Sequence, residues 1–311
     1  MMKITVFGVV ALCMFAQPVL AQDKGSVKGW TAKGTFDLGI RLGKNLPLDA
    51  DPDLVDESEL GAKIAFKRKS SNGLVPLQFS FGITDSPGLV KGADPASTYF
   101  GRITIGDAYL PLRELTLASD PTKSATAVSD AIRPYAYYQY SSLHDGLLKK
   151  RQREDNEVGV GLRYRDVVTI MADRAMNGSA EEVGAATNTP GWYWEASGQI
   201  ARIWSSNPDK EKLVPQVKLS VYSPIIRRVR FFAKGQGDFS FYQSALTPMG
   251  DDRQDQRLRV TAGVDLSSLV EDWGDVSLEI AGQFQRQWSN DPTAESTRGY
   301  FLPSASISFE F

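Results

Sequence analysis

The chain has 311 residues, of which 42% are hydrophobic and 23% charged, and its formal net charge is -2. Beyond Ala21 there is no stretch of about 18 consecutive apolar residues, which excludes a bundle of transmembrane helices. The averages do not exclude a chain whose strands have an apolar face and a polar face, because the two faces cancel in the composition.

The first 21 residues have the three parts of a secretory signal peptide. Lys3 supplies a positive start, Ile4 to Phe15 an apolar core, and Val19-Leu20-Ala21 the small or modest side chains before cleavage. We therefore expect a signal peptide at 1–21 and a single mature domain at 22–311. An uncleaved anchor, the alternative, would need a longer apolar run. The only cysteine lies inside the apolar core, so the mature chain has no disulfide framework.

Downstream, apolar and polar residues alternate, which is typical of strands with one apolar face. The first such strand runs from Trp30 to Leu42. Leu60 to Phe66 pairs plausibly with Val75 to Ile83, because Ser70 to Gly73 between them suits a tight hairpin turn. The later runs follow the same pattern: Val158 to Tyr164 with a return through Val168 to Ala172, Val217 to Val221, Val229 to Phe241, Leu258 to Leu266, and Val276 to Trp288.

We count about fourteen strands, with twelve as the alternative. The count is open because Tyr99 to Leu117 and Glu157 to Asp173 can each be drawn as one strand or two. With fourteen strands, the long polar connector from Ser142 to Asn156 falls at the end of the molecule where short turns are expected. The residues offer no way to remove this conflict.

The last strand has the clearest alternation, from Phe301 to Phe311. It resembles the closing strand of Gram-negative outer-membrane β-barrels, which ends in an aromatic residue recognised by the barrel assembly machinery. The resemblance implies an assembly signal at Phe309 and Phe311, a place in the outer membrane, and contact with its lipid and lipopolysaccharide. Hydrocarbon tolerates no open sheet edge, so the first strand near Trp30 must close against the last. The expected fold is an all-β, closed antiparallel transmembrane barrel; a soluble β-sandwich is the alternative.

The face opposite the apolar one should line the lumen. Its basic groups outnumber its acidic ones, which favours a channel for small anionic or saccharide-like solutes. On the strand from Arg228 to Tyr242 we expect a row of cations that Asp238 alone cannot neutralise. If cations instead pair with acids across strands, the barrel is a non-conducting structural or surface-receptor protein. The predicted lumen-lining residues are Lys33, Arg41, Lys63, Arg163, Lys218, Tyr222, Arg228, Arg230, Lys234, Asp238, Tyr242, Arg257 and Arg259.

Catalysis is not expected. The only histidine is His144, in a polar connector, and its surroundings resemble none of the motifs of outer-membrane proteases, phospholipases or lipid A deacylases. No cluster of His or Cys suits a metal, and no glycine-rich loop suits a phosphate. The sequence thus predicts no cofactor, no metal and no nucleic-acid partner, and an outer-membrane lipid-modifying enzyme or protease stays the less favoured alternative.

A second resemblance rests on short turns alone. The segments Tyr109-Leu110-Pro111-Leu112-Arg113 and Tyr222-Ser223-Pro224 resemble turns in the C-terminal barrels of exopolysaccharide export proteins. The resemblance implies a role in polysaccharide export. Those proteins carry a helical repeat region before the barrel, and this chain has none, so such a role would require a separate periplasmic partner.

Overall fold

The computed structural model describes residues 30–39, 42–45, 54–56, 59–68, 76–86, 95–107, 110–117, 126–165, 192–270 and 276–310. Several predicted features lie outside the described residues: the signal peptide, Arg41, Phe311, the turn from Ser70 to Gly73, and the return strand from Val168 to Ala172. No helix in the described part of the chain is long and apolar enough to cross a membrane.

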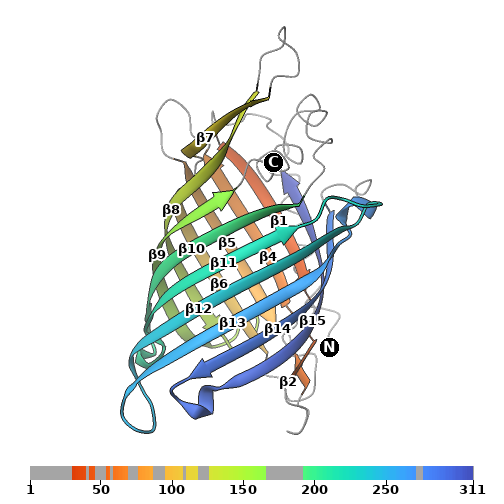
Figure 1. Ribbon diagram of the computed structural model, residues 1–311. Helices are drawn as coiled ribbons and strands as arrows, with labels where there is room; N and C mark the ends of the chain where they lie inside the picture. The colour runs from red at the N-terminus through yellow and green to blue at the C-terminus, as the bar shows by residue number, and fades with distance from the viewer. Residues whose placement is uncertain are drawn as a thin grey trace.

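Twelve strands form one antiparallel sheet that closes on itself (Figure 1). In order around the ring they are β1 (Trp30–Gly39), β4 (Glu59–Arg68), β5 (Leu77–Ser86), β6 (Ala96–Gly106), β8 (Thr126–His144), β9 (Arg151–Arg165), β10 (Tyr193–Ser205), β11 (Lys212–Tyr222), β12 (Arg230–Leu246), β13 (Asp252–Asp265), β14 (Val276–Ser289) and β15 (Ser296–Glu310). Three short strands lie beside this ring: β2 (Leu42–Asn45), which pairs with β15, β3 (Leu54–Asp56), which pairs with β2, and β7 (Leu110–Leu117), which pairs with β8. Single 3-10 turns occupy Pro208–Lys210, Ser267–Leu269 and Pro292–Ala294.

The first and last strands close the ring, as the sequence predicted. Gly34 of β1 is opposite Phe309 of β15, and Phe36 is opposite Ile307. Each of the twelve described ring strands thus has a hydrogen-bonded neighbour on both sides, which satisfies the backbone groups that a sheet edge would expose. In Figure 1 the C-terminus lies at the same rim as the hairpin of β7 and β8, which extends beyond that rim.

The predicted closed antiparallel barrel is confirmed, with the alternative count of twelve strands rather than fourteen. Tyr99 to Leu117 supplies one ring strand, β6, and the short β7 outside the ring. The expected long connector from Ser142 to Asn156 is mostly strand, because β8 continues to His144 and β9 starts at Arg151. Where a strand leaves the apolar zone its outer face need not be apolar, so the alternation fades while the hydrogen-bonded ladder continues.

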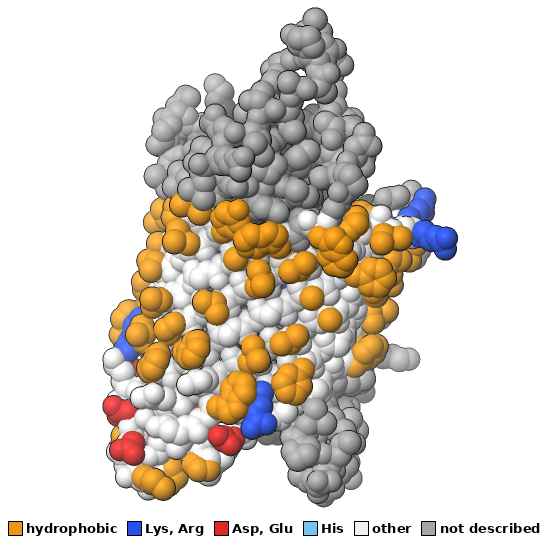
Figure 2. Space-filling view, in the orientation of Figure 1, with side chains coloured by type: hydrophobic (Ala, Val, Ile, Leu, Met, Phe, Trp, Pro, Cys, Tyr) orange, Lys and Arg blue, Asp and Glu red, His pale blue; other side chains and the backbone are white. Residues whose placement is uncertain are grey.

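The outer wall of the barrel carries large apolar side chains at every second strand position. Phe81 is 56% exposed, Val160 57% and Val217 59%. Figure 2 shows hydrophobic side chains over this outer wall, with Asp and Glu near the lower rim in that view. Exposed Trp192, at the start of β10, and Trp204, at its end, lie where aromatic girdles of barrels occur. The barrel is therefore apolar outside, which in water would be an unstable arrangement.

Candidate functional site: the barrel lumen

The inner wall consists of the strand positions that alternate with the exposed apolar ones. Val217 and Leu219 are exposed on the outside of β11, so Lys218 between them points inward. By the same alternation, most of the predicted lumen residues occupy inward positions: Lys33, Lys63, Arg163, Lys218, Tyr222, Arg230, Lys234, Asp238, Tyr242, Arg257 and Arg259. A closed barrel that is apolar outside and polar inside fits a bilayer. The described chain is a closed β-barrel whose two faces suit a membrane.

Arg228 was wrongly assigned to this wall. It lies in the turn between β11 and β12, where Arg227 and Arg228 have positive φ angles of 51° and 66°. Both residues therefore belong to the rim of the barrel and not to a strand. The sequence hid this turn because the alternating pattern already begins at Val229, one residue before the first residue of β12.

The expected row of unneutralised cations on β12 is also corrected, since each cation has an acidic neighbour on an adjacent strand or the next. Lys234 Nζ lies 3.6 Å from Glu279 Oε2, and Arg230 Nη1 lies 4.0 Å from Asp265 Oδ2. Asp238 is only 5% exposed, and its Oδ2 forms an ion pair with Arg259 Nη2 at 3.1 Å. The wall of β12 to β14 is thus a network of alternating charges.

Asp238 is the centre of that network. Its Oδ1 accepts hydrogen bonds from Gln216 Nε2 at 2.6 Å and from Gln236 Nε2 at 2.9 Å, while its Oδ2 faces Arg259. Three strands, β11, β12 and β13, are therefore tied together through one buried carboxylate. A guanidinium and two amide donors thus surround this carboxylate.

Other inward cations make no close ion pair with a carboxylate. The inward basic side chains that the structure describes and that have no carboxylate oxygen within 4.0 Å include Lys63, Arg102, Lys212, Lys218 and Arg257. They come from β4, β6, β11 and β13. In ring order β4 and β11 stand half the ring apart, and so do β6 and β13. Unpaired cations therefore face the lumen from opposite walls.

Two tyrosines of β8 lie flat against the inner wall instead of filling the lumen. They do so because glycines lie beneath them on β9: a Cβ at Gly161 would be 2.6 Å from Tyr135 Cζ, and one at Gly159 would clash with Tyr137. The Tyr135 hydroxyl donates to Gln199 Oε1 at 2.8 Å, and the Arg102 guanidinium lies 3.7 Å from the centre of the Tyr137 ring. These contacts hold aromatic and cationic groups on the wall.

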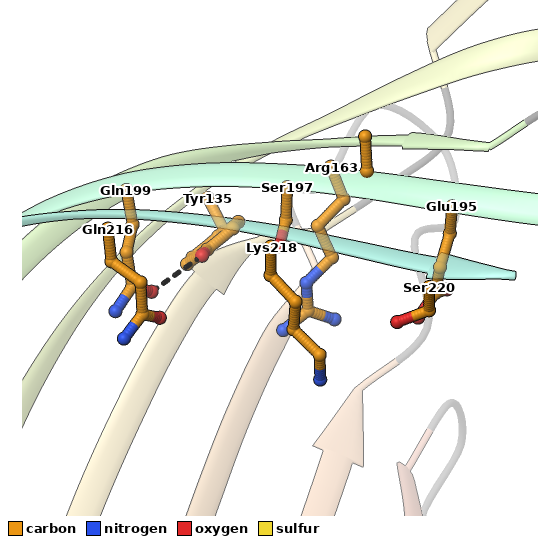
Figure 3. A pocket seen from close by; sticks show the side chains of 9 residues that line it. Tyr135, Arg163, Glu195, Ser197, Gln199, Gln216, Lys218 and Ser220 are labelled. Carbon is orange, nitrogen blue, oxygen red and sulfur yellow. Dashed lines mark hydrogen bonds between the residues drawn. The ribbon is translucent and has the colours of Figure 1, made fainter. Parts of the chain in front are cut away.

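A cavity of about 320 Å³ opens in the wall formed by β8 to β11 (Figure 3). We call it the wall cavity. Three directly opposed residue pairs of β10 and β11 line it, because the small Ser197 and Ser220 leave room between longer neighbours. The pairs are Glu195 with Ser220, Ser197 with Lys218, and Gln199 with Gln216, and Tyr135 and Arg163 complete the lining.

Arg163 is held beside the wall cavity by an acid at the rim. Asp107 has a positive φ angle of 67°. Its carboxylate forms ion pairs with Arg163 Nη1 at 3.4 Å and with Arg133 Nε at 3.3 Å. Ser220 differs, because it is 1% exposed and its Oγ has no hydrogen-bond partner in the described structure. The wall cavity therefore contains both a fixed cation and an unsatisfied hydroxyl.

The sequence did not identify Arg102, Tyr135, Gln216 or Ser220 as lumen residues. On β8 the alternation was hidden, because Tyr138 faces outward and is also aromatic. The sequence does contain one clearer signal. Glycines at alternate positions of β9, Gly159 and Gly161, lie beside aromatic residues at alternate positions of β8, Tyr137 and Tyr135, and this pattern predicts rings that lie flat on a shared face.

His144 lies at the end of β8, on the outward face that Tyr138 and Tyr140 share. Its Nε2 lies 2.8 Å from Ser142 Oγ, its Nδ1 lies 2.8 Å from the Lys149 carbonyl oxygen, and its ring meets the edge of the Tyr99 ring. The described residues contain no group of His, Cys, Asp and Glu side chains that could hold a metal.

No protein-family model and no curated protein matches the chain. Among solved structures it is similar to the β domain of the Bordetella autotransporter Brka, with 9% identity and a TM-score of 0.41 over 90% of this chain and 100% of that one. It is also similar to the translocator domain of the autotransporter NalP from Neisseria meningitidis, with 11% identity and a TM-score of 0.35 over 97% of each chain. The KdgM porin in complex with disordered oligogalacturonate aligns with 6% identity and a TM-score of 0.35 over 88% of this chain and 99% of that one. These likenesses concern the fold alone.

Proposed function

We propose that the barrel is a channel for small anionic or saccharide-like solutes. The observation that supports this is the set of unpaired inward cations on opposite walls, including Lys63 on β4 and Arg257 on β13. A plugged barrel would use each basic side chain to neutralise an acid. Cations without acidic partners raise the local concentration of anions and give sugar carboxylates and hydroxyls groups to bind.

The barrel width is compatible with a pathway. Eight-stranded barrels have interiors that side chains just fill, and porins of about 16 to 18 strands enclose aqueous channels. A ring of twelve strands lies between these sizes. Tyr135 and Tyr137 lie flat on the wall, so two of the largest inward side chains do not cross the lumen.

Reversal potentials in a planar bilayer with a salt gradient test the channel. A unit charge about 10 Å from a passing ion contributes about 0.4 kcal/mol in water, which changes ion occupancy about twofold. Because each positive charge attracts anions and repels cations to the same extent, the double variant Lys63→Gln with Arg257→Gln should lower the anion-to-cation permeability ratio about sixteenfold. Lys150→Gln, an exposed residue of the β8–β9 turn, is the matched control and should change nothing.

Stable conductance with the expected loss of anion preference supports the proposal. A folded barrel that conducts no ions under any applied voltage refutes it, and would favour the structural or receptor barrel. Export of a longer acidic polysaccharide would use the same lumen charges and would need a periplasmic partner to deliver the polymer.

One observation favours a second function, hydrolysis of a lipid ester at the outer face. Ser142 Oγ, His144 Nε2 and the Lys149 carbonyl oxygen form a chain of two 2.8 Å contacts, the order in which a nucleophile, a base and an orienting group occur. Ser142 is only 6% exposed, so an ester reaches it only after the β8–β9 turn opens. Labelling by a fluorophosphonate that disappears in Ser142→Ala would support this activity, and absence of labelling in the unmodified barrel would exclude it.

A further inference from the structure

We propose that the wall cavity is a binding subsite for one residue of an acidic sugar, with the carboxylate of a hexuronate on Lys218 and the ring hydroxyls on the surrounding amides and hydroxyls. The proposal rests on the channel function and deepens it by naming the ligand class and its place in the lumen. The observations that carry it are a cation without an ion pair, an unsatisfied buried hydroxyl, and a matched set of donors and acceptors within one cavity.

Lys218 is the cation that the cavity offers to a ligand. It points inward from β11 and makes no ion pair or hydrogen bond in the described part of the chain, and Glu195 of the cavity and Glu279 attract its charge only at longer range. Arg163, the other cation of the cavity, already contacts Asp107 at 3.4 Å. An ammonium in a partly enclosed site attracts a carboxylate more strongly than it would in bulk water, because solvent screens it less.

Ser220 supplies the observation that points to a ligand. It lines the cavity, is 1% exposed, and its Oγ has no hydrogen-bond partner among the described residues. Leaving a buried hydroxyl unsatisfied lowers stability, and alanine would fit the same space without that loss. A ligand oxygen in the cavity would satisfy the hydroxyl two residues along β11 from Lys218.

The two glutamines offer complementary groups to a polyol. Gln199 uses its Oε1 to accept from Tyr135, which leaves its Nε2 able to donate. Gln216 uses its Nε2 to donate to Asp238, which leaves its Oε1 able to accept. These side chains are directly opposite each other on β10 and β11. Sugar hydroxyls both donate and accept, so this pair suits a sugar better than a bare inorganic anion.

The size of the cavity limits the ligand to one or two sugar residues. Its volume of about 320 Å³ is at the low end of the range of about 300 to 1,000 Å³ for small-molecule pockets. Figure 3 shows Lys218 and Arg163 extending on the same side of the wall, with the hydrogen-bonded Tyr135 and Gln199 next to them. A hexuronate placed there meets the cations at its carboxylate and the amides at its ring.

Isothermal titration calorimetry with the full, folded barrel in detergent micelles tests the subsite independently of conductance. We expect sodium glucuronate to bind saturably, and glucose and sodium acetate to bind at least tenfold more weakly. Lys218→Gln should weaken glucuronate binding at least tenfold, because a hydrogen bond to a charged group is lost, and Lys218→Arg should restore most of it. The matched control is Lys210→Gln, an exposed lysine at the far end of the same hairpin, which should bind as the unmodified barrel does.

Ser220→Ala separates a binding role from a structural one. If Oγ serves the ligand, the variant should bind glucuronate about threefold to tenfold more weakly while its folded barrel withstands heating at least as well. Equal binding of glucuronate, glucose and acetate would overturn the subsite, and so would unchanged glucuronate affinity in Lys218→Gln. A barrel that conducts but binds no glucuronate loses the subsite and keeps the channel. A barrel that binds glucuronate through Lys218 but does not conduct keeps the subsite and loses the channel.

Discussion

Replacing Asp238 by Asn perturbs the charge network of the lumen at its centre. The substitution keeps the shape of the side chain and removes its charge. The carboxylate is 5% exposed and accepts from Gln216, Gln236 and Arg259. In the variant an amide can still accept one of these bonds, but the Arg259 guanidinium loses its counter-ion.

The expected loss of stability follows from the burial of the two partners. Breaking a fully buried ion pair by removing one partner costs about 3 to 5 kcal/mol, and exposed pairs contribute about 0 to 1 kcal/mol. The Asp238 side chain is 6% exposed and that of Arg259 is 30% exposed, so lumen water screens one partner in part. We therefore expect Asp238→Asn to lower the free energy of unfolding by about 2 to 3 kcal/mol.

Urea-induced unfolding of the barrel in lipid vesicles, read by the difference in gel mobility between folded and unfolded chains, measures this loss. Asp251→Asn is the matched control, since Asp251 is exposed in the turn between β12 and β13. Salt should reduce the difference between the two variants. If Asp238→Asn is no less stable than Asp251→Asn, the network does not stabilise the barrel and the account of β12 to β14 fails.

Three further predictions concern the two faces of the wall. Gly161→Val should displace the Tyr135 ring and lower the free energy of unfolding by about 1 to 3 kcal/mol. The control Gly235→Ala, which has no atom within 4 Å of the added Cβ, should lower it by less than about 1 kcal/mol. Equal losses of the two variants in urea unfolding would contradict the flat packing of Tyr135. Val160→Arg should destabilise the barrel by about 2 to 4 kcal/mol if Val160 faces the bilayer midplane, and normal assembly and stability of this variant would contradict that. Raising the salt concentration to about 1 M shortens the Debye length to about 3 Å, so the permeability ratio measured in bilayers should approach one; an unchanged ratio would point to size rather than charge as the basis of selectivity.

The fold was predictable where lipid imposes an apolar face. In the first and last strands the apolar residues alternate clearly, and the closure of these two strands is as predicted, although β1 ends at Gly39 and Leu42 begins the separate strand β2. The number of strands was less certain, because β7 is a true strand that pairs only with β8 and does not join the ring. Outside the apolar zone the residues of β8 and β9 do not alternate, so nothing in the sequence marked Arg151 as the start of a strand.

The direction of lumen side chains was predictable, and their partners were not. Alternation alone indicated that Lys234 and Arg259 face inward. It could not indicate that Lys234 pairs with Glu279 on β14, because that contact depends on the stagger of three strands across the sheet. The wall cavity was invisible for the same reason, since it arises where Ser197 and Ser220 fall between longer side chains of different strands.

The lumen charges divide into two kinds with different consequences. The pairs on β12 to β14 hold neighbouring strands together and contribute little net field, because each cation lies within 4.0 Å of a carboxylate. The unpaired cations differ: Lys63 and Lys218 have no carboxylate oxygen within 4.0 Å and approach the lumen from strands half the ring apart. In the proposed channel, an anion that leaves Lys218 is attracted again by Lys63 from the other side of the ring, so neither cation retains it. This is the condition under which a binding group speeds passage instead of stopping it, because the solute gains enough to enter and not so much that it cannot leave.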